Sequence, residues 1–404
     1  MKVAVMGYGT VGSGVVEVIE HHSDIIPKRT GGKALEISHI LDLRDFPNDA
    51  HKDLFTKDFN DILNDEETKI VAETMGGVNP AFDFTMKLLK AGKSVVTSNK
   101  ELAQRGLELL QAAEESGANY LFEASVGGGI PIIRPLCQCL AANYIEGIAG
   151  ILNGTTNFIL TMMIEKGMSF DEALKIAQEK GYAEKDPTAD VEGYDACRKV
   201  CILASLAFGK HVYPNQVETE GITNITLEDV SYIENAGGVI KLLGQIKYIN
   251  DNEIAAFVSP AVVYNGSQLA SVKDVFNAIL VRGDAVGDVC FYGPGAGKLP
   301  TASAVVADII DCAKHSERKK IFGWGAGAED YVVDYKERIE MPFYVRAKAT
   351  PAEINAKFSD VKFLSRKGQP SDEVAFITDI MTENKLSKKL DGINVINTIK
   401  VTNY

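Results

Sequence analysis

The stretch GYAEKDPTADVEGYDACRKVCILASLAFG, residues 181–209, gathers several acidic residues ahead of a lysine. Within it Asp195 and Lys199 are four positions apart, so both would lie on one face of a helix. Strongly apolar residues follow, and we expect that face to be partly buried. A lysine beside a carboxylate in such a place can move a proton to or from a substrate. An exposed ion pair on an acidic surface is the structural alternative, and the spacing alone favours neither.

A second group of residues, near the start of the chain, could hold a phosphate. Gly7, Gly9 and Gly12 fit the pattern G-x-G-x-x-G, directly after an apolar run at residues 2–6 and before a helical pattern. In that context the first glycine allows a tight turn, the second lets the backbone approach a pyrophosphate, and the third lets helix and strand pack closely. The helix N-terminus would supply N–H donors to the anion. The pattern predicts dinucleotide binding, with a plain strand–helix turn as the alternative.

Two further candidate sites follow predicted strands of the same region. Lys100, in VVTSNKEL, comes after the predicted strand 94–97, at the edge where doubly wound sheets bind ligands; a solvated lysine is the alternative. After the predicted strand 35–41, Asp42 would accept a hydrogen bond from a ribose 2′-hydroxyl and favour NAD. Arg44 would instead pair with a 2′-phosphate and favour NADP. We favour NADP slightly over NAD.

These residues must be positioned by the elements around them, and the first part of the chain alternates strand and helix patterns. Such alternation is typical of a doubly wound parallel sheet. The predicted strands are 2–6, 35–41, 70–74, 94–97 and 120–123, and the predicted helices are 11–20, 80–91 and 102–116. After EASVGGGIPIIRP the pattern is mixed α+β, with strands at 147–152 and 255–264 and helices at 170–180, 195–208 and 301–313. The tail has the ferredoxin-like order βαββαβ, in segments 343–348, 351–358, 361–365, 373–378, 383–390 and 397–402.

The overall composition limits the class of protein. A formal net charge of −13 argues against nucleic acid or an anionic membrane as a partner, because either needs a broad basic surface. The six cysteines lack zinc-binding spacing, so we expect free thiols in a reducing cytosol. The sequence shows neither a leader peptide nor a long apolar stretch, and we expect a cytoplasmic protein. The six histidines lie outside these motifs, which favours lysines and carboxylates as proton carriers.

Taken together, the motifs resemble those of the homoserine dehydrogenases over most of residues 1–310. The matching segments are GYGTVGSGV, ETMGGVNPA, VVTSNK, FEASVGGGIPII, NGTTNFIL, GYAEKDPTADVEGYDACRK and YGPGAGKLPTASAVVAD. The resemblance implies reduction of L-aspartate 4-semialdehyde to L-homoserine with NADPH or NADH, on the route to threonine and methionine. The alternatives are another amino-acid or semialdehyde dehydrogenase on the same fold, or a dinucleotide sensor without turnover.

The resemblance also implies roles for individual residues. Lys199 would be the catalytic lysine, and Lys100 a second lysine near the nicotinamide and the substrate. The substrate-binding residues would be Glu184, Asp195, Asn153, Gly154 and Thr155. The cofactor-binding residues would be Gly7, Gly9, Thr10, Val11, Gly12, Asp42, Arg44, Ser98, Lys100, Gly295 and Gly297. A structural Na+ would be held by the main-chain carbonyls of Glu123, Val126, Gly128 and Ile130, although a plain glycine turn between two domains would look the same.

The fold implied by the resemblance is α/β, with three domains and assembly into a homodimer or a dimer-based oligomer. Residues 1–130 with the helix 300–316 would form a Rossmann-type dinucleotide-binding domain with a doubly wound parallel sheet. Residues 131–299 would form an α+β substrate-binding and dimerisation domain, and residues 317–404 a linker with a small ferredoxin-like, ACT-like domain. Such a domain often senses threonine in this family, but here Pro351-Ala352 stands where the ACT pattern has Pro-Gly. A regulatory role and a structural or dimerising role both stay open.

Overall fold

The computed structural model describes residues 1–101, 105–317 and 320–404, which form two compact units. Unit 1 consists of Met1–Ala142, Cys201–Pro214 and Gly293–Gly327, and unit 2 of Asn143–Val200, Asn215–Tyr292 and Ala328–Tyr404. The expected division into three domains is finer than this and stays a prediction. Among the described helices, none is both long enough and apolar enough to cross a membrane.

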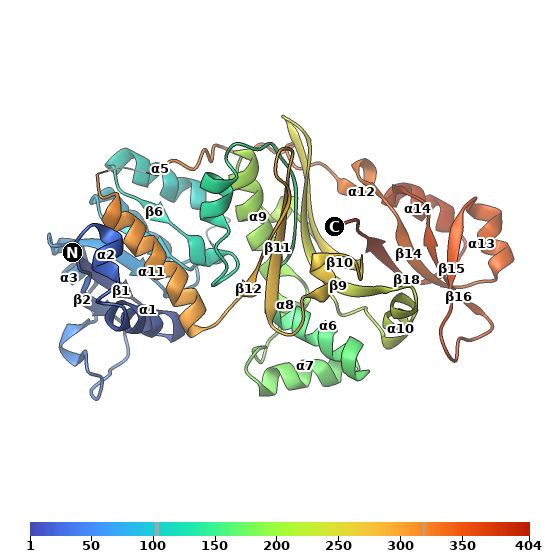
Figure 1. Cartoon of the computed structure of the whole chain (residues 1–404), viewed down its shortest axis with the longest axis horizontal. Coiled ribbons are helices and arrows are strands. Elements are labelled where there is room, and N and C mark those ends of the chain that lie inside the picture. The colour runs from blue at the N-terminus through green and yellow to red at the C-terminus, as the bar shows by residue number, and fades with distance from the viewer. Residues whose placement is uncertain (102–104, 318–319) are drawn as a thin grey trace. The chain divides into compact units, whose positions relative to one another are not determined.

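The described part of unit 1 is built on a six-stranded parallel sheet with the order β3-β2-β1-β4-β5-β6. Its strands β1, β2 and β6 are labelled in Figure 1. Its strands are β1 (Lys2–Met6), β2 (Glu36–Leu41), β3 (Phe55–Thr56), β4 (Thr68–Glu73), β5 (Ser94–Thr97) and β6 (Tyr120–Leu121). The chain reverses direction across the sheet between β1 and β4, which is where doubly wound sheets bind ligands. The predicted Rossmann-type parallel sheet is confirmed.

Helices pack in two groups against this sheet. One group is α1 (Thr10–His21), α2 (Ile26–Thr30) and α11 (Lys298–Lys314), and the other is α3 (Phe59–Asn64), α4 (Ala81–Lys90) and α5 (Gly106–Ser116). Right-handed crossovers place the two groups on opposite faces. Val5, Val15, Ile70 and Ile309 belong to one buried apolar cluster, so α11 completes this core from far along the chain. Of the helix expected at 102–116, residues 102–104 lie outside the described residues.

Within the described residues, unit 2 contains a ten-stranded mixed sheet with the path β12-β11-β7-β9-β10-β18-β14-β16-β15, and β8 pairs with β10 off this path. Its strands are β7 (Ile145–Ile151), β8 (Glu218–Thr219), β9 (Gly238–Asn250), β10 (Glu253–Tyr264), β11 (Phe276–Gly283), β12 (Gly287–Pro294), β14 (Phe343–Lys348), β15 (Val361–Leu364), β16 (Glu373–Thr378) and β18 (Asn394–Val401). A small ribbon joins β13 (Glu340–Met341) to β17 (Met381–Thr382). The helices are α6 (Gly154–Lys166), α7 (Phe170–Glu179), α8 (Thr188–Val191), the first part of α9 (Tyr194–Phe208, of which the part from Cys201 belongs to unit 1), α10 (Leu227–Asn235), α12 (Tyr335–Arg338), α13 (Pro351–Lys357) and α14 (Glu383–Leu390). Unit 2 thus supplies the mixed α+β part of the fold.

The tail of unit 2 has the predicted βαββαβ order, with β18-β14-β16-β15 as neighbouring antiparallel strands. This segment is continuous with the rest of the unit, because β18 pairs in parallel with β10 through Ala261–Lys400 and Val262–Val401. Phe257 of β10 also packs in the same apolar cluster as Phe343 and Phe376 of the tail. One sheet therefore runs through the whole of unit 2.

Two long elements of unit 2 were missed by the sequence patterns. Strand β9 is buried along most of its length, but Lys241 and Gln245 are among its buried residues, so its sequence shows neither a continuous apolar run nor alternation. Helix α6 is buried on nearly all sides, and its apolar residues form no single stripe. Neither sequence therefore shows the periodic pattern that is typical of its kind of element.

Candidate active site

The glycine-rich turn of unit 1 has the shape of a cradle for a pyrophosphate. Gly7 follows β1 with φ +92°, and a Cβ on Gly12 would lie only 1.8 Å from Gly7 O. Glycine at position 12 is therefore needed for α1 to approach the strand this closely. Gly9 borders open space, and among the described residues no side chain caps the N-terminus of α1. The first N–H groups of this helix, at Thr10 and Val11, fit an anionic dinucleotide phosphate.

The two predicted readers of the adenosine ribose lie together at the carboxyl end of β2. Asp42 accepts a hydrogen bond from Tyr8 N at 2.8 Å, and Arg44 Nη2 donates to Asp42 Oδ2 at 2.8 Å and to Tyr8 O at 3.0 Å. The hydrogen bonds from Arg44, with that from Tyr8 N, hold the pKa of the Asp42 carboxyl well below its usual range. The Asp42 side chain is 9% exposed and that of Arg44 62%. Asp42 thus braces the glycine turn, and Arg44 presents a cation to solvent beside it.

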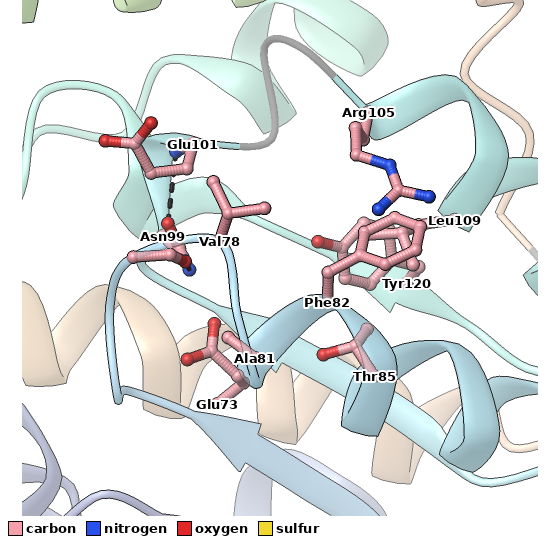
Figure 2. A pocket seen from close by; sticks show the side chains of 11 residues that line it. Glu73, Val78, Ala81, Phe82, Thr85, Asn99, Glu101, Arg105, Leu109 and Tyr120 are labelled. Carbon is pink, nitrogen blue, oxygen red and sulfur yellow. Dashed lines mark hydrogen bonds between the residues drawn. The ribbon is translucent and has the colours of Figure 1, made fainter.

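The predicted cofactor residues Ser98 and Lys100 follow β5 at the carboxyl edge of the same sheet. Lys100 is half-buried. Beside this turn lies a small hollow, shown in Figure 2, whose walls include the Glu73 carboxylate and the Phe82 ring. The guanidinium of Arg105 stacks over that ring, with its carbon 3.3 Å from the ring centroid. Polar and charged groups from β4, α4 and the start of α5 therefore border the turn that carries Lys100.

In unit 2, helix α9 presents Asp195 and Lys199 on one face, as the spacing predicts. Lys199 Nζ donates to Asp195 Oδ2 at 2.7 Å and to Leu152 O at 2.6 Å. The side chains are 12% exposed for Lys199 and 3% for Asp195, which excludes an exposed surface ion pair. A lysine has three N–H donors, and these two oxygens are its hydrogen-bond partners among the described residues. One donor remains for the oxygen of a substrate.

Asn153 joins this pair to the start of α6. Its Oδ1 accepts from Thr156 N at 2.9 Å, which makes Asn153 the N-cap of the helix. Its Nδ2 donates to Asp195 Oδ2 at 2.9 Å and to Asp190 Oδ1 at 2.7 Å. Asp190 belongs to this cluster, although it was not among the predicted substrate-binding residues. Its place in the acidic loop was the one feature of the sequence that pointed to it, because its partner Asn153 is remote in the chain.

The other predicted substrate-binding residues have different surroundings. Gly154 begins α6, where a Cβ would lie 2.7 Å from a main-chain carbonyl, and Thr155 Oγ1 donates to Tyr182 O at 2.7 Å. Glu184 is exposed, and its main-chain carbonyl accepts from Gln178 Nε2 at 3.1 Å. The structure thus does not bring the Glu184 side chain into the lysine cluster, and its role in substrate binding stays a prediction.

The predicted cation site lies in a second glycine turn of unit 1. Gly128 has φ +56°, and a Cβ there would lie 2.3 Å from Gly295 O, so two glycine segments pack backbone to backbone. Gly297, with φ +126°, follows and precedes α11. The Glu123 carboxylate accepts from the N–H groups of Ile132 and Ile133 at 2.6 and 2.8 Å, which closes the turn.

Side-chain metal ligands do not gather at this turn. Across the described parts of the chain, no group of three or more His, Cys, Asp or Glu side chains is placed to hold a metal ion. Main-chain carbonyls are a different kind of ligand, and they suit a hard cation. Binding of Na+ by the carbonyls of Glu123, Val126, Gly128 and Ile130 stays a prediction.

The Rossmann-type sheet with its glycine cradle, and the buried lysine–carboxylate cluster, define an NAD(P)-dependent oxidoreductase that acts on a CH–OH group. The family model for the NAD-binding domain of homoserine dehydrogenase matches residues 7–123, and the homoserine dehydrogenase model matches residues 131–310. The chain belongs to the homoserine dehydrogenase family.

Individual relatives support the same assignment. The homoserine dehydrogenase of Bacillus subtilis is 42% identical over 320 residues, which cover 78% of this chain and 73% of the relative. That of Neisseria gonorrhoeae is 36% identical over 425 residues, covering 99% and 96%. The crystal structure of a homoserine dehydrogenase from Thiobacillus denitrificans has a TM-score of 0.88 at 35% identity and covers 100% of this chain and 98% of that one. A hyperthermophilic archaeal homoserine dehydrogenase mutant in complex with NADPH has a TM-score of 0.65 at 29% identity, covering 77% and 96%.

Proposed function

We propose that Lys199 exchanges a proton with the substrate oxygen while L-aspartate 4-semialdehyde and L-homoserine interconvert. The observation that carries this proposal is the buried Lys199 ammonium, which Leu152 O and Asp195 hold with one N–H donor left over. Bound NAD(P)H supplies the hydride that reduces the aldehyde carbon. Lys199 stabilises the charge that develops on the aldehyde oxygen and delivers the proton that completes the alcohol, with Lys100 assisting.

In this proposal Asp195 and Glu184 bind the cationic amino group of the substrate, because carboxylates form charge-assisted hydrogen bonds with it. Asn153, Gly154 and Thr155 line the substrate at the start of α6. The test measures reduced-nicotinamide absorbance during oxidation of L-homoserine and of a short panel of other amino alcohols. We expect the highest kcat/KM for L-homoserine, and a clear preference for another amino alcohol would contradict the substrate assignment.

We infer that NADP is preferred over NAD, because the exposed guanidinium of Arg44 lies beside Asp42 at the end of β2. The archaeal relative in complex with NADPH supports this inference. Arg44→Ala should raise the KM for NADP about 10-fold, as expected for one lost phosphate contact, while the KM for NAD stays the same. An equal rise for both cofactors would show that Arg44 does not distinguish them.

We also propose that the βαββαβ tail is an ACT-like module, because its strand order is that of a ferredoxin-like fold. Inhibition of turnover by millimolar threonine would support a regulatory role, and an unchanged rate would support a structural or dimerising one. The proposed homodimer is checked by analytical ultracentrifugation. The proposed Na+ site is checked by comparing the melting temperature in Na+ with that in a bulky organic cation.

A further inference from the structure

A buried carboxylate at the end of β4 has no part in the mechanism proposed above. Glu73 is 2% exposed and lies in unit 1, where it forms one wall of the hollow in Figure 2. A charge in such a place is costly unless hydrogen bonds compensate it. Both oxygens of Glu73 receive such bonds, and the donors come from two separate turns.

The first turn is the one that carries Lys100. Thr97 Oγ1 donates to Glu73 Oε2 at 2.6 Å and accepts from Asn99 N at 2.9 Å. Asn99 in turn accepts from Glu101 N at 3.0 Å and donates from Nδ2 to Gly77 O at 2.7 Å. The backbone is therefore held immediately before and after Lys100, and the chain of hydrogen bonds ends on Glu73.

The second turn follows Glu73 itself. Glu73 Oε1 accepts from Met75 N at 2.8 Å and from Gly76 N at 3.3 Å. This turn lies against the glycine cradle, because Thr74 Oγ1 donates to Gly7 O at 2.8 Å. One carboxylate thus anchors the turn that supports the cradle and the turn that carries Lys100.

Position 73 needs a side chain that accepts hydrogen bonds at both of its terminal atoms, because the groups around Glu73 are donors. The Thr97 hydroxyl and the main-chain N–H groups of Met75 and Gly76 all donate to the carboxylate. An amide of the same shape would point its NH₂ group at one of these donors and leave that donor without a partner. A buried donor left in this way loses its hydration without a compensating hydrogen bond, which destabilises this arrangement of the two turns.

We propose that Glu73 and Thr97 are positioning residues for Lys100, and that Glu73 also sets the turn that supports the cofactor cradle. The inference rests on the proposed role of Lys100 in the reaction. Thr97 acts on the Lys100 turn alone, whereas Glu73 acts on both turns. The two residues therefore have different expected effects on turnover and on cofactor binding.

A double-mutant cycle in the full-length enzyme tests the link between Thr97 and Lys100. Thr97→Val keeps the shape of the side chain but removes the hydroxyl, and should lower kcat about 10-fold with the Kd for NADPH within about twofold. Thr97→Ser restores the hydroxyl and should recover most of kcat. If Thr97 works through Lys100, the double variant Thr97→Val/Lys100→Ala should be no slower than Lys100→Ala alone.

Glu73→Gln tests the second half of the proposal. It should lower kcat and also raise the Kd for NADPH about 10-fold. The amide cannot accept from both turns at once, and in either orientation its NH₂ group faces a donor, which displaces the side chain that joins the two turns. Thr68→Val is the matched control, since Thr68 is fully buried at the opposite end of β4 and donates to Asp65 Oδ2 at 2.6 Å. It should lower the melting temperature about as much as Thr97→Val and leave kcat unchanged.

The outcomes separate this inference from the proposed function. A wild-type kcat in Lys100→Ala would remove the proposed role of Lys100 and this inference with it. An impaired Lys100→Ala beside a normal Thr97→Val, or effects that multiply in the double variant, would overturn the inference alone. A normal Kd for NADPH in Glu73→Gln would overturn the claim that Glu73 supports the cradle.

Discussion

Unit 1 and unit 2 prepare their candidate sites in different ways. In unit 1 the cradle consists of backbone, namely the glycines at 7, 9 and 12 and the first N–H groups of α1. In unit 2 the cluster consists of side chains, with Lys199 and Asn153 both donating hydrogen bonds to Asp195. A backbone cradle depends on the absence of Cβ atoms, whereas a buried charged cluster depends on every polar atom having a partner. Substitutions that add a side chain to the glycine cradle should therefore weaken cofactor binding. Substitutions that remove one polar group from the Lys199 cluster should instead lower turnover.

The largest effect is expected from the side-chain cluster. Lys199→Ala should lower kcat at least about 10²-fold, because the proton donor and the charge next to the reacting oxygen are both lost. The Kd for NADPH, measured by fluorescence titration, should stay nearly unchanged. Lys175→Ala on α7, at an exposed position, is the control and should keep wild-type turnover. Near-normal turnover in Lys199→Ala would remove Lys199 from the mechanism.

The next effect separates two glycines of the cradle. Gly12→Ala places a methyl group 1.8 Å from Gly7 O, so it should lower the melting temperature and raise the Kd for NADPH at least about 10-fold. Gly9→Ala adds its methyl group to open space, so it should weaken NADPH binding with an unchanged melting temperature. Calorimetry with and without cofactor measures both quantities. Equal melting temperatures for the two variants would argue against the close helix–strand contact at Gly12.

A smaller effect on activity is expected at Asn153, which both caps helix α6 and belongs to the Lys199 cluster. Asn153→Ala removes the cap of α6 and should cost about 1 kcal/mol of stability, with a several-fold loss of kcat/KM. Asn153→Ser keeps a capping oxygen but cannot reach both carboxylates, so it should keep the stability and still lose activity. If Asn153→Ser has full activity, the amide contacts to Asp190 and Asp195 do not matter for turnover.

The smallest effect on activity is expected at a buried carboxyl outside both sites. Burial raises the pKa of Asp308 in unit 1 to about 7, and the charge of Glu123 adds to the rise. Between about pH 4 and pH 7 the folded protein therefore binds more protons here than the unfolded chain, and this contribution to the free energy of unfolding is lost as the pH rises.

Asp308→Asn is neutral at every pH and keeps an acceptor for Glu123 N, which donates to Asp308 Oδ2 at 2.8 Å. Its NH₂ group replaces the oxygen that accepts from the Arg134 guanidinium, a loss that shifts the stability of the variant without creating the pH dependence. Relative to wild type, the variant should become more stable as the pH rises through this window, with little change in kcat. Urea unfolding at several pH values measures this difference. Parallel pH profiles for the two proteins would show that Asp308 does not titrate there.

The elements that the sequence predicted well are those with a local pattern. Strands β5, β14 and β16 and helix α14 have the predicted bounds, because glycines, prolines and other turn residues mark their ends in the sequence. Strand β9 was missed because the buried polar residues Lys241 and Gln245 interrupt its apolar run, and helix α6 because its apolar residues form no single stripe. The continuation of the sheet from β10 into β18 could not be predicted either, since parallel pairing between distant segments has no local signature.

By itself the sequence determined the features that depend on neighbours in the chain. The glycine spacing of the first turn and the four-residue spacing of Asp195 and Lys199 act within one turn or one helix, where geometry follows from position. Only the tertiary structure decided what surrounds them. It brings Leu152 O and Asn153 to the cluster of α9, and it places Glu73 against the two turns of unit 1. The physical reason is that buried polar groups must find partners wherever the fold provides them, and the fold brings together residues that are far apart in the chain.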